Sequence, residues 1–236
     1  MKPEIIAHRG ASFLATHENT LESFQLAIDI GADYVEFDIR QTIDHCLIIF
    51  HDSSFEGTEI ASVTYEELCR QTEKRGFNPP LLVDVLKLCQ GKIKLDIELK
   101  ETGYESSVVE IVKEFFDYDM FSIKSFLDTS VLRVKTIDSR ITTGLLLGYP
   151  NGTLKRRIHE YFPERRIRIC RADFVSPHYQ LATREFIHRM HARHRKVYIW
   201  TVDDATLMGK FIRRGVDGII TNKPDAGIFI RKGFSV

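Results

Sequence analysis

Short apolar runs alternate with amphipathic stretches along almost the whole chain. Nine of these runs are rich in β-branched and aromatic residues and predict strands: Ile5–His8, Tyr34–Ile39, Leu47–His51, Ile93–Leu99, Met120–Phe126, Thr142–Leu147, Asp173–Pro177, Lys196–Val202 and Gly218–Thr221. The sequence shows neither a stretch of linker composition nor a short-period repeat. The pattern therefore predicts a single domain over residues 1–236.

Several helix boundaries can be placed between the strands. Asn19-Thr20-Leu21-Glu22 predicts an N-cap with a capping-box Glu, and Gly31 predicts the end of that helix. Thr64-Tyr65-Glu66-Glu67 is a second capping box. Three more helices are predicted from apolar residues at helical spacing: Leu82, Val85, Leu86 and Cys89 before Gly91; Val108, Val112 and Phe115; and Leu207, Met208, Phe211 and Ile212 before Gly215.

Alternating strands and helices predict parallel strands with helical crossovers. Nine candidates are one too many for a closed eight-stranded barrel. The connection from Arg40 to Cys46 is too short for a helix, so we interpret 47–51 as an antiparallel extension of 34–39. A hairpin turning at Asp44 is expected to place His51 opposite Glu36. The remaining eight strands predict an α/β fold, the (β/α)₈ barrel. A doubly wound open sheet is the alternative, weakened because no G-x-G-x-x-G follows the first strand.

Composition and charge narrow the function classes. The chain of 236 residues is 43% hydrophobic and 28% charged, which is typical of globular proteins and excludes disorder. Its 33 Lys and Arg balance 33 Asp and Glu, which argues against a nucleic-acid partner or stable membrane association. No transmembrane run or signal peptide is evident, so we expect a cytoplasmic protein. Cys46, Cys69, Cys89 and Cys170 form no C-x-x-C pair and are expected to be reduced, mostly buried thiols.

Candidate catalytic residues lie where the predicted strands end, because barrel active sites are built at that face. Alternation along a strand places Glu36 and Asp38 on one face, and Glu98 and Lys100 on one face of the next. Their neighbours Val35, Phe37, Ile39, Ile97 and Leu99 would point toward the helices. Three carboxylates, Glu36, Asp38 and Glu98, would then meet inside the barrel mouth.

Such a cluster needs positive charge, because burying carboxylates without it is costly. A hard cation, Mg²⁺ or Ca²⁺, prefers carboxylate oxygens and would supply that charge. Internal ion pairs with Arg9, Arg40 and Lys100 are the alternative.

His8 and His51 reach the same rim, where two imidazoles suit general acid and base work. A cation flanked by Arg9 and Lys100 suits a phosphate. The residues alone therefore indicate metal-assisted phosphoryl chemistry.

The order of motifs resembles the glycerophosphodiester phosphodiesterase family. The resemblance rests on His8-Arg9-Gly10, Glu18-Asn19-Thr20, Glu36-Phe37-Asp38, His51-Asp52 and Glu98-Leu99-Lys100, and it continues through Trp200-Thr201-Val202 into residues 215–222. It implies a barrel that hydrolyses glycerophosphodiesters, small-molecule substrates, to an alcohol and glycerol 3-phosphate with one divalent cation. By the same matching, Glu36, Asp38 and Glu98 would bind the metal, His8 and His51 would be the acid–base pair, and Arg9 and Lys100 would hold the phosphate.

Three departures from the family pattern stand out. His17 replaces the Pro before Glu-Asn-Thr and is expected to be a surface loop residue, with Asn19 still capping the helix. Asn222 replaces the Asp of the closing Thr-Asp-Lys-Pro-like motif. The insertion after His51 is reduced around 55–58, so residues 53–80 are expected to be a short cover over the barrel mouth, with the choice of alcohol left open.

Three further sequence features bear on function. Trp200 ends an inner strand and is a candidate to pack against glycerol, with a core role as the alternative. His188, His191 and His194 alternate with arginines, have no flanking carboxylate and are expected on a solvated helix face. A basic run at 165–168 could contact anionic membrane surfaces, but the balanced net charge gives no wider field. A lysophospholipase D-like activity and a non-catalytic phosphate-ligand-binding barrel remain the alternative functions, and the headgroup and oligomeric state stay open.

Overall fold

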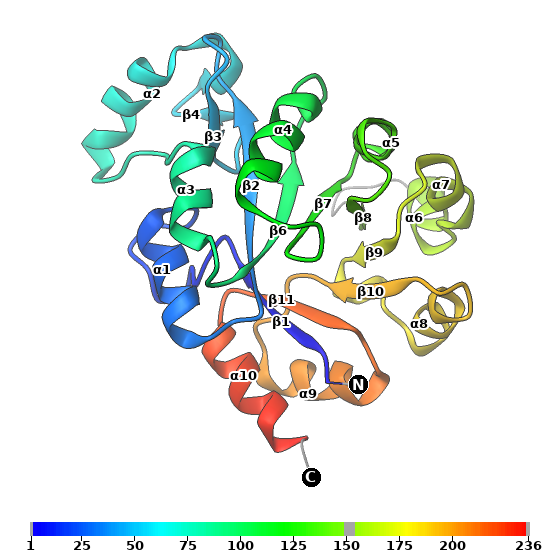
Figure 1. Cartoon of the computed structure of the whole chain (residues 1–236). Coiled ribbons are helices and arrows are strands. Elements are labelled where there is room, and N and C mark those ends of the chain that lie inside the picture. The colour runs from blue at the N-terminus through cyan, green and yellow to red at the C-terminus, as the bar shows by residue number, and fades with distance from the viewer. Residues whose placement is uncertain (1, 149–153, 235–236) are drawn as a thin grey trace.

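A closed ring of parallel strands forms the centre of the computed structural model, which describes residues 2–148 and 154–234 (Figure 1). Within these residues the ring has eight strands: β1 (Glu4–His8), β2 (Tyr34–Gln41), β6 (Lys94–Leu99), β7 (Phe121–Ser125), β8 (Thr142–Leu147), β9 (Phe174–Pro177), β10 (Lys196–Ile199) and β11 (Gly218–Thr221). Strand β1 pairs with both β2 and β11 and closes the ring. The predicted (β/α)₈ barrel is therefore confirmed, and the open sheet is excluded.

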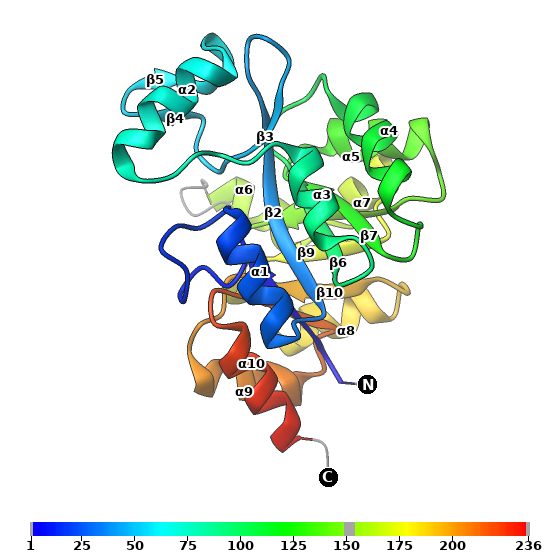
Figure 2. The same ribbon diagram turned by 60° about the vertical axis from the view of Figure 1, so that its left-hand side comes forward.

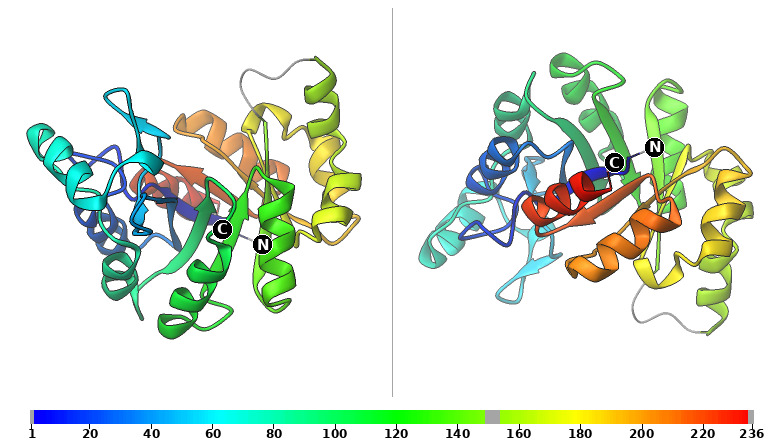
Figure 3. Two further views of the ribbon diagram at one scale, coloured as in Figure 1. Left: turned by 90° about the horizontal axis from the view of Figure 1, so that it is seen from above. Right: turned by 90° about the horizontal axis from the view of Figure 1, so that it is seen from below.

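Helices surround the ring on its outside (Figure 3). They are α1 (Leu21–Ile30), α3 (Leu82–Cys89), α4 (Glu105–Phe115), α5 (Asp128–Ile137), α6 (Leu154–Tyr161), α7 (Glu164–Cys170), α8 (Arg184–His191), α9 (Ala205–Arg214) and α10 (Pro224–Gly233). Helix α1 ends at Gly31 as predicted, but its capping box joins Thr20 to Ser23, one residue later than the predicted pair. The shift arises because Asn19 turns left-handed (φ 55°) and points its amide inward instead.

Apolar side chains fill two layers. The outward residues of β2 and β6, Val35, Phe37, Ile39, Ile97 and Leu99, are buried against the helices as predicted. Inside the barrel, Phe174 and Tyr198 pack with ring centroids 4.9 Å apart, beside Ile6 and Ile220. These side chains fill the half of the barrel where the strands begin. The charged side chains consequently gather toward the other end, where the strands finish.

Strand β3 (Leu47–Ile49) extends the sheet antiparallel to β2. The five-residue turn is centred at Asp44 as predicted, with Thr42 N donating to Cys46 O at 3.1 Å. Ile39 pairs with Ile49, so continuation of this register places His51 level with Phe37. The predicted pairing of His51 with Glu36 is therefore wrong by one residue.

The insertion at 53–80 folds into small elements beside β3 (Figure 2). They are β4 (Ser54–Phe55), β5 (Thr58–Glu59), α2 (Tyr65–Thr72) and two 3₁₀ turns, η1 (Ile60–Ser62) and η2 (Glu73–Arg75). A core of its own, formed by Ile48, Ile60 and Leu68, anchors the insertion to β3. Among the described helices, none has the length and apolar composition needed to span a bilayer.

Candidate active site

Most of the predicted site residues line one small cavity at the ends of the strands. The cavity measures about 50 Å³ and is lined by His8, Arg9, Glu36, His51, Glu98, Lys100, Lys124, Phe126, Leu146, Trp200 and Ile220. They come from β1, β2, β6, β7, β8, β11 and the connections that follow the strands. None of the described residues at 53–80 lines it.

Three carboxylates converge as the alternation of β2 and β6 predicted. Asp38 lies beside Glu98 in the parallel register, and Glu36 precedes Asp38 on the same face. All three residues are at most 6% exposed. One oxygen from each carboxylate lies within 4.8 Å of the others. This oxygen-only set in a buried position has the composition that Mg²⁺ and Ca²⁺ prefer.

Two cations contact Asp38, the middle member of this cluster. Lys100 Nζ lies 2.9 Å from Asp38 Oδ1 and 2.5 Å from Glu98 Oε1, and Arg9 Nε lies 3.3 Å from Asp38 Oδ2. Arg40, the third cation expected here, instead donates to the His51 carbonyl and pairs with Glu101.

Burial and charge push the pKa values of this carboxylate pair apart. The ammonium of Lys100 and the guanidinium of Arg9 hold the pKa of Asp38 well below its usual range, against the effect of burial. Burial raises the pKa of Glu98 to about 7, with further contributions from the charges of Asp38 and Glu36. A bound cation would favour the ionised form of Glu98 against this effect of burial.

A left-handed turn after β1 presents Arg9 to the cluster. Arg9 has φ 55° and Gly10 has φ 81°. A Cβ on Gly10 would lie 2.4 Å from Ser23 Oγ, so only glycine fits. In this turn Arg9 N donates to Glu36 Oε2 at 3.1 Å, and its guanidinium pairs with Glu18 at 2.6 Å. The turn therefore links the first strand to the carboxylates of the second.

Each histidine is held through its Nδ1 atom. His8 Nδ1 lies 2.7 Å from Asn222 Oδ1, and His51 Nδ1 lies 2.7 Å from Asp52 Oδ1. Burial lowers the pKa of His51, and Lys100 lowers it further, outweighing the opposite effect of Asp38. Both rings line the cavity, so two groups able to exchange protons face the carboxylate cluster.

Sequence reasoning missed several buried partners of these residues. Lys124 Nζ lies 2.6 Å from Asp96 Oδ2 and 3.3 Å from Glu36 Oε1. Asn19 Nδ2 donates to Asp38 Oδ2 at 2.8 Å. The alternation of Ser122 and Lys124 with apolar residues in β7 was the signal that Lys124 points inward.

Trp200 lies at the cavity, whereas His17 lies in a loop against Phe77. Trp200 lines the cavity, donates Nε1–H to Ser176 O at 2.8 Å and packs edge-on against Phe126. His17 is half-buried in its loop, with its ring centroid 4.7 Å from that of Phe77.

The predicted histidine face of α8 is exposed, but two details differ from expectation. His188 and His191 lie on the helix, whereas His194 follows its end. His191 Nε2 lies 2.7 Å from Asp217, so the expectation of no flanking carboxylate is wrong. Asp217 precedes β11, and only the folded sheet brings it to α8.

Comparison with known proteins shows which family this chain resembles along its length. Residues 8–226 match the model of the glycerophosphoryl diester phosphodiesterase family. The chain is 31% identical to a glycerophosphodiester phosphodiesterase from Caldanaerobacter subterraneus, over 99% of this chain and 100% of that protein. It is 29% identical to one from Bacillus altitudinis, over 97% and 98% of the two chains.

Solved structures share the fold. A glycerophosphodiester phosphodiesterase from Parabacteroides distasonis superposes with a TM-score of 0.85 at 25% identity, covering 100% of this chain and 99% of that one. A phosphodiesterase from Oleispira antarctica, solved in complex with the product sn-glycerol-3-phosphate, gives 0.83 at 23% identity, with coverage of 98% and 97%.

Proposed function

The chain belongs to the glycerophosphoryl diester phosphodiesterase family, a family of hydrolases, and we propose that it cleaves glycerophosphodiesters into an alcohol and glycerol 3-phosphate by metal-assisted acid–base catalysis. One observation carries the mechanism: Glu36 and Glu98 of the buried carboxylate cluster line a single cavity together with two histidines and three cations. This combination provides positive charge for a phosphate and proton-transfer groups beside it.

The donor atoms fit a divalent cation. Glu36, Asp38 and Glu98 would hold Mg²⁺ or Ca²⁺ through oxygen. Beside them, Asn19 Oδ1 is buried without a hydrogen-bond partner, while the other end of that amide donates to Asp38. When bound, such a cation supplies positive charge to the phosphate oxygens.

Arg9 and Lys100 would bind the phosphate beside this cluster. Both side chains line the cavity and already face carboxylates, so a phosphate oxygen can take over one of their contacts. The exposed edge of Trp200 would pack against the glycerol carbons. These contacts orient the diester without making or breaking its bonds.

Proton transfer falls to the two histidines. One takes a proton from the attacking oxygen, which is either water or the 2-hydroxyl of the glycerol, and the other gives a proton to the leaving alkoxide. Each has its Nδ1 engaged by a neighbour, which leaves Nε2 for the reaction.

The test is hydrolysis of glycerophosphocholine, followed as release of glycerol 3-phosphate. The enzyme is assayed after chelation and again with Mg²⁺, Ca²⁺ or Mn²⁺. We expect activity to vanish on chelation and to return with at least one of these cations. Full activity after exhaustive chelation would contradict the metal, and no product from any glycerophosphodiester would contradict the function.

A lysophospholipid substrate belongs in the same assay as a second candidate. Apolar side chains are exposed on the connections after β1 and β7: Phe13 is 64% exposed, Leu14 47% and Leu127 37%. Phe13 N bonds to Asn222 O, and Leu127 follows a cavity-lining residue, so both lie near the mouth. The lysophospholipid would release acylated glycerol 3-phosphate. Faster release of this product than of glycerol 3-phosphate from glycerophosphocholine would favour the lysophospholipase D-like activity.

A further inference from the structure

We propose that Asn222 and Asp203 are positioning residues that keep the ring proton of His8 on Nδ1 and so assign Nε2 of His8 as the atom that receives a proton from the attacking oxygen. The proposal rests on the proposed function, because it explains how one of the two histidines is prepared for that reaction. It concerns two residues that never touch the diester themselves.

Asp203 fixes the orientation of the Asn222 side chain. Its Oδ2 accepts from Asn222 Nδ2 at 2.7 Å, and its Oδ1 accepts from Asn222 N at 2.8 Å and from Thr221 Oγ1 at 2.9 Å. The amide nitrogen of Asn222 therefore faces a carboxylate. Turning the amide over would place two acceptor oxygens against each other, which is strongly unfavourable.

The fixed amide decides the tautomer of His8. Asn222 Oδ1 lies 2.7 Å from His8 Nδ1 and 2.8 Å from Ser12 Oγ. An amide oxygen only accepts hydrogen bonds, so Nδ1 of His8 must donate and must carry the proton. The other ring nitrogen, Nε2, then has a free electron pair in the neutral ring.

The two histidines differ in how this contact is built. His51 bonds to its chain neighbour Asp52, a side chain that is 72% exposed. His8 bonds to a residue 214 positions away, which the pairing of β1 with β11 brings beside it. The other titratable groups that line the same cavity are Arg9, Glu36, His51, Glu98, Lys100 and Lys124. A neutral amide adjoining His8 selects the tautomer without adding another charge.

An exchange of the two side chains tests the proposal. In Asp203→Asn the two amide nitrogens would collide, so Asn222 should turn over, present Nδ2 to His8 and force the proton onto Nε2. In Asn222→Asp two carboxylates would face each other at the same place. In the double variant, an Asn at 203 can donate to an Asp at 222, whose other oxygen again accepts from His8.

Enzyme kinetics form the first readout. We expect each single variant to lower kcat at least tenfold with KM changed less than threefold, and the double variant to return to within threefold of the wild type. Thermal unfolding of all four proteins shows whether each variant is folded. Failure of the double variant to recover, with its unfolding midpoint close to the wild type, would overturn the proposal.

The nitrogen spectrum of the His8 ring, assigned with His8→Gln, is the second readout. We expect an Nδ1–H tautomer in the wild type and the double variant, and Nε2–H in Asp203→Asn. An Nε2–H wild type would overturn the proposal, as would a changed tautomer that leaves kcat unaltered. If the wild type hydrolyses no diester, the proposed function fails, while this spectrum still decides the tautomer.

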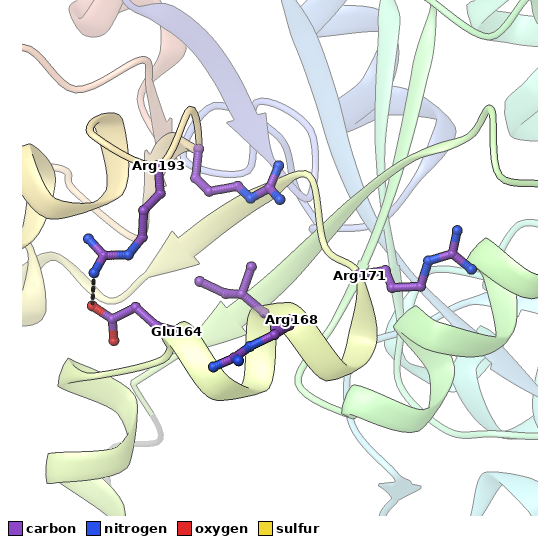
Figure 4. Close-up of a pocket in the computed structure, with 6 residues that line it drawn as sticks. Glu164, Arg168, Arg171 and Arg193 are labelled. Carbon is purple, nitrogen blue, oxygen red and sulfur yellow. Dashed lines mark ion pairs between the residues drawn. The ribbon is translucent and has the colours of Figure 1, made fainter.

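A separate observation supports a second site, and we infer that an arginine cleft at the opposite end of the barrel binds a compact anion with two or more phosphate groups. The cleft measures about 590 Å³ and is lined by Glu164, Ile167, Arg168, Arg171, Arg193 and Arg195 (Figure 4). It lies between α7 and the turn from α8 to β10. Arg171, Arg193 and Arg195 occupy the connections that lead into β9 and β10, where these strands begin. It is therefore remote from the catalytic rim.

The positive charge of this cleft is largely uncompensated. Arg193 lies 4.0 Å from Glu164, whereas Arg168, Arg171 and Arg195 form no ion pair with any described residue. Residues 164–196 carry nine Lys and Arg against three Asp and Glu, although the whole chain is neutral. Arg171 also adopts the left-handed conformation (φ 61°) at the end of α7, a position where glycine is usual. An arginine is thus held there at a conformational cost.

Guanidinium groups favour phosphate because they offer paired donors. The lining residues include no aromatic ring on which a base could stack, which favours a small phosphate-rich anion over a nucleic acid.

Inorganic triphosphate is the probe, titrated calorimetrically in buffer of low salt without divalent cations. We expect Arg168→Gln/Arg195→Gln to weaken binding at least tenfold, and the matched control Lys74→Gln/Lys87→Gln, which removes two exposed charges elsewhere, to change it less than twofold. No binding at millimolar probe would overturn the inference. So would binding that survives in the arginine variant and is lost in Arg9→Gln, because the anion would then occupy the catalytic mouth.

Discussion

Replacing Lys124 with methionine should destabilise the barrel more than the loss of a surface charge would. Its Nζ lies 2.6 Å from Asp96 Oδ2 and 3.3 Å from Glu36 Oε1, and all three side chains are at most 2% exposed. Removing one partner of a buried pair leaves an uncompensated charge and costs about 3–5 kcal/mol. In a chain of this size the thermal midpoint should fall by roughly 6–20 °C, at about 2–4 °C per kcal/mol.

The loss of unfolding free energy in Lys124→Met is measured by urea unfolding. The unfolding is followed by the fluorescence of Trp200, the one tryptophan of the chain. Lys113→Met is the matched control, because Lys113 is an exposed side chain that pairs with Asp138 at 2.9 Å, and its loss should destabilise the protein far less than the loss of Lys124. Adding Asp96→Asn to Lys124→Met removes one orphaned carboxylate and should recover about 2 kcal/mol.

Two results would refute the reasoning on Lys124. A loss no larger than that of the Lys113 control would mean that the buried carboxylates do not depend on this ammonium. Strict additivity of Lys124→Met and Asp96→Asn would mean that the two side chains are not energetically coupled. Burial already raises the pKa of Asp96, so protonation of this group is the route by which the variant could relieve its charge.

Four further outcomes are expected. His8→Ala and His51→Ala should each lower kcat by roughly 10²-fold with a smaller effect on KM, and a variant with near-normal kcat would remove that histidine from the mechanism. Burial raises the pKa of Glu98 to about 7, so ionising this group costs stability in the folded protein. The free energy of unfolding of the metal-free protein should therefore fall as pH rises from about 5 to 8, whereas that of Glu98→Gln should not. A parallel pH dependence in both proteins would contradict this. Diesters of choline, ethanolamine, glycerol and inositol should have kcat/KM values within roughly 200-fold, since none of the described residues of the insertion lines the cavity, and a preference of several thousand-fold would show a closed, specific cover. Burial raises the pKa of Cys89 to about 12 and of Cys170 to about 11, so mass spectrometry should find both unmodified after iodoacetamide treatment of the native protein at pH 8, and rapid labelling of either would contradict their burial.

The strands and the barrel follow from local pattern. Alternation in β2 and β6 was sufficient to bring Glu36, Asp38 and Glu98 to one face, because side chains two apart on a strand point the same way whatever the rest of the chain does. Parallel pairing of neighbouring strands then placed the carboxylates together.

Side-chain contacts between residues far apart in the chain could not be predicted from the sequence. Asn222 meets His8 only because the last strand returns to the first, and no spacing encodes which atoms then touch. Asn19 was predicted as a helix cap from its residue type, but its left-handed backbone directs the amide to Asp38 and leaves the cap to Thr20. Local propensity was enough to predict the helix. Tertiary contacts determined which of two adjacent polar residues, Asn19 or Thr20, is its N-cap.

The position of β1 between β2 and β11 has a consequence for biosynthesis. Ile5 and Ile6 of β1 cannot complete their pairing until β11, about 210 residues later, has left the ribosome. At roughly 5–20 residues per second, the first strand waits about 10–40 s with one edge unpaired. During that interval an apolar strand edge is open to other nascent chains. The ring that carries the catalytic rim is thus closed only after β11 has been synthesised, and chaperone protection of β1 should matter most in that interval.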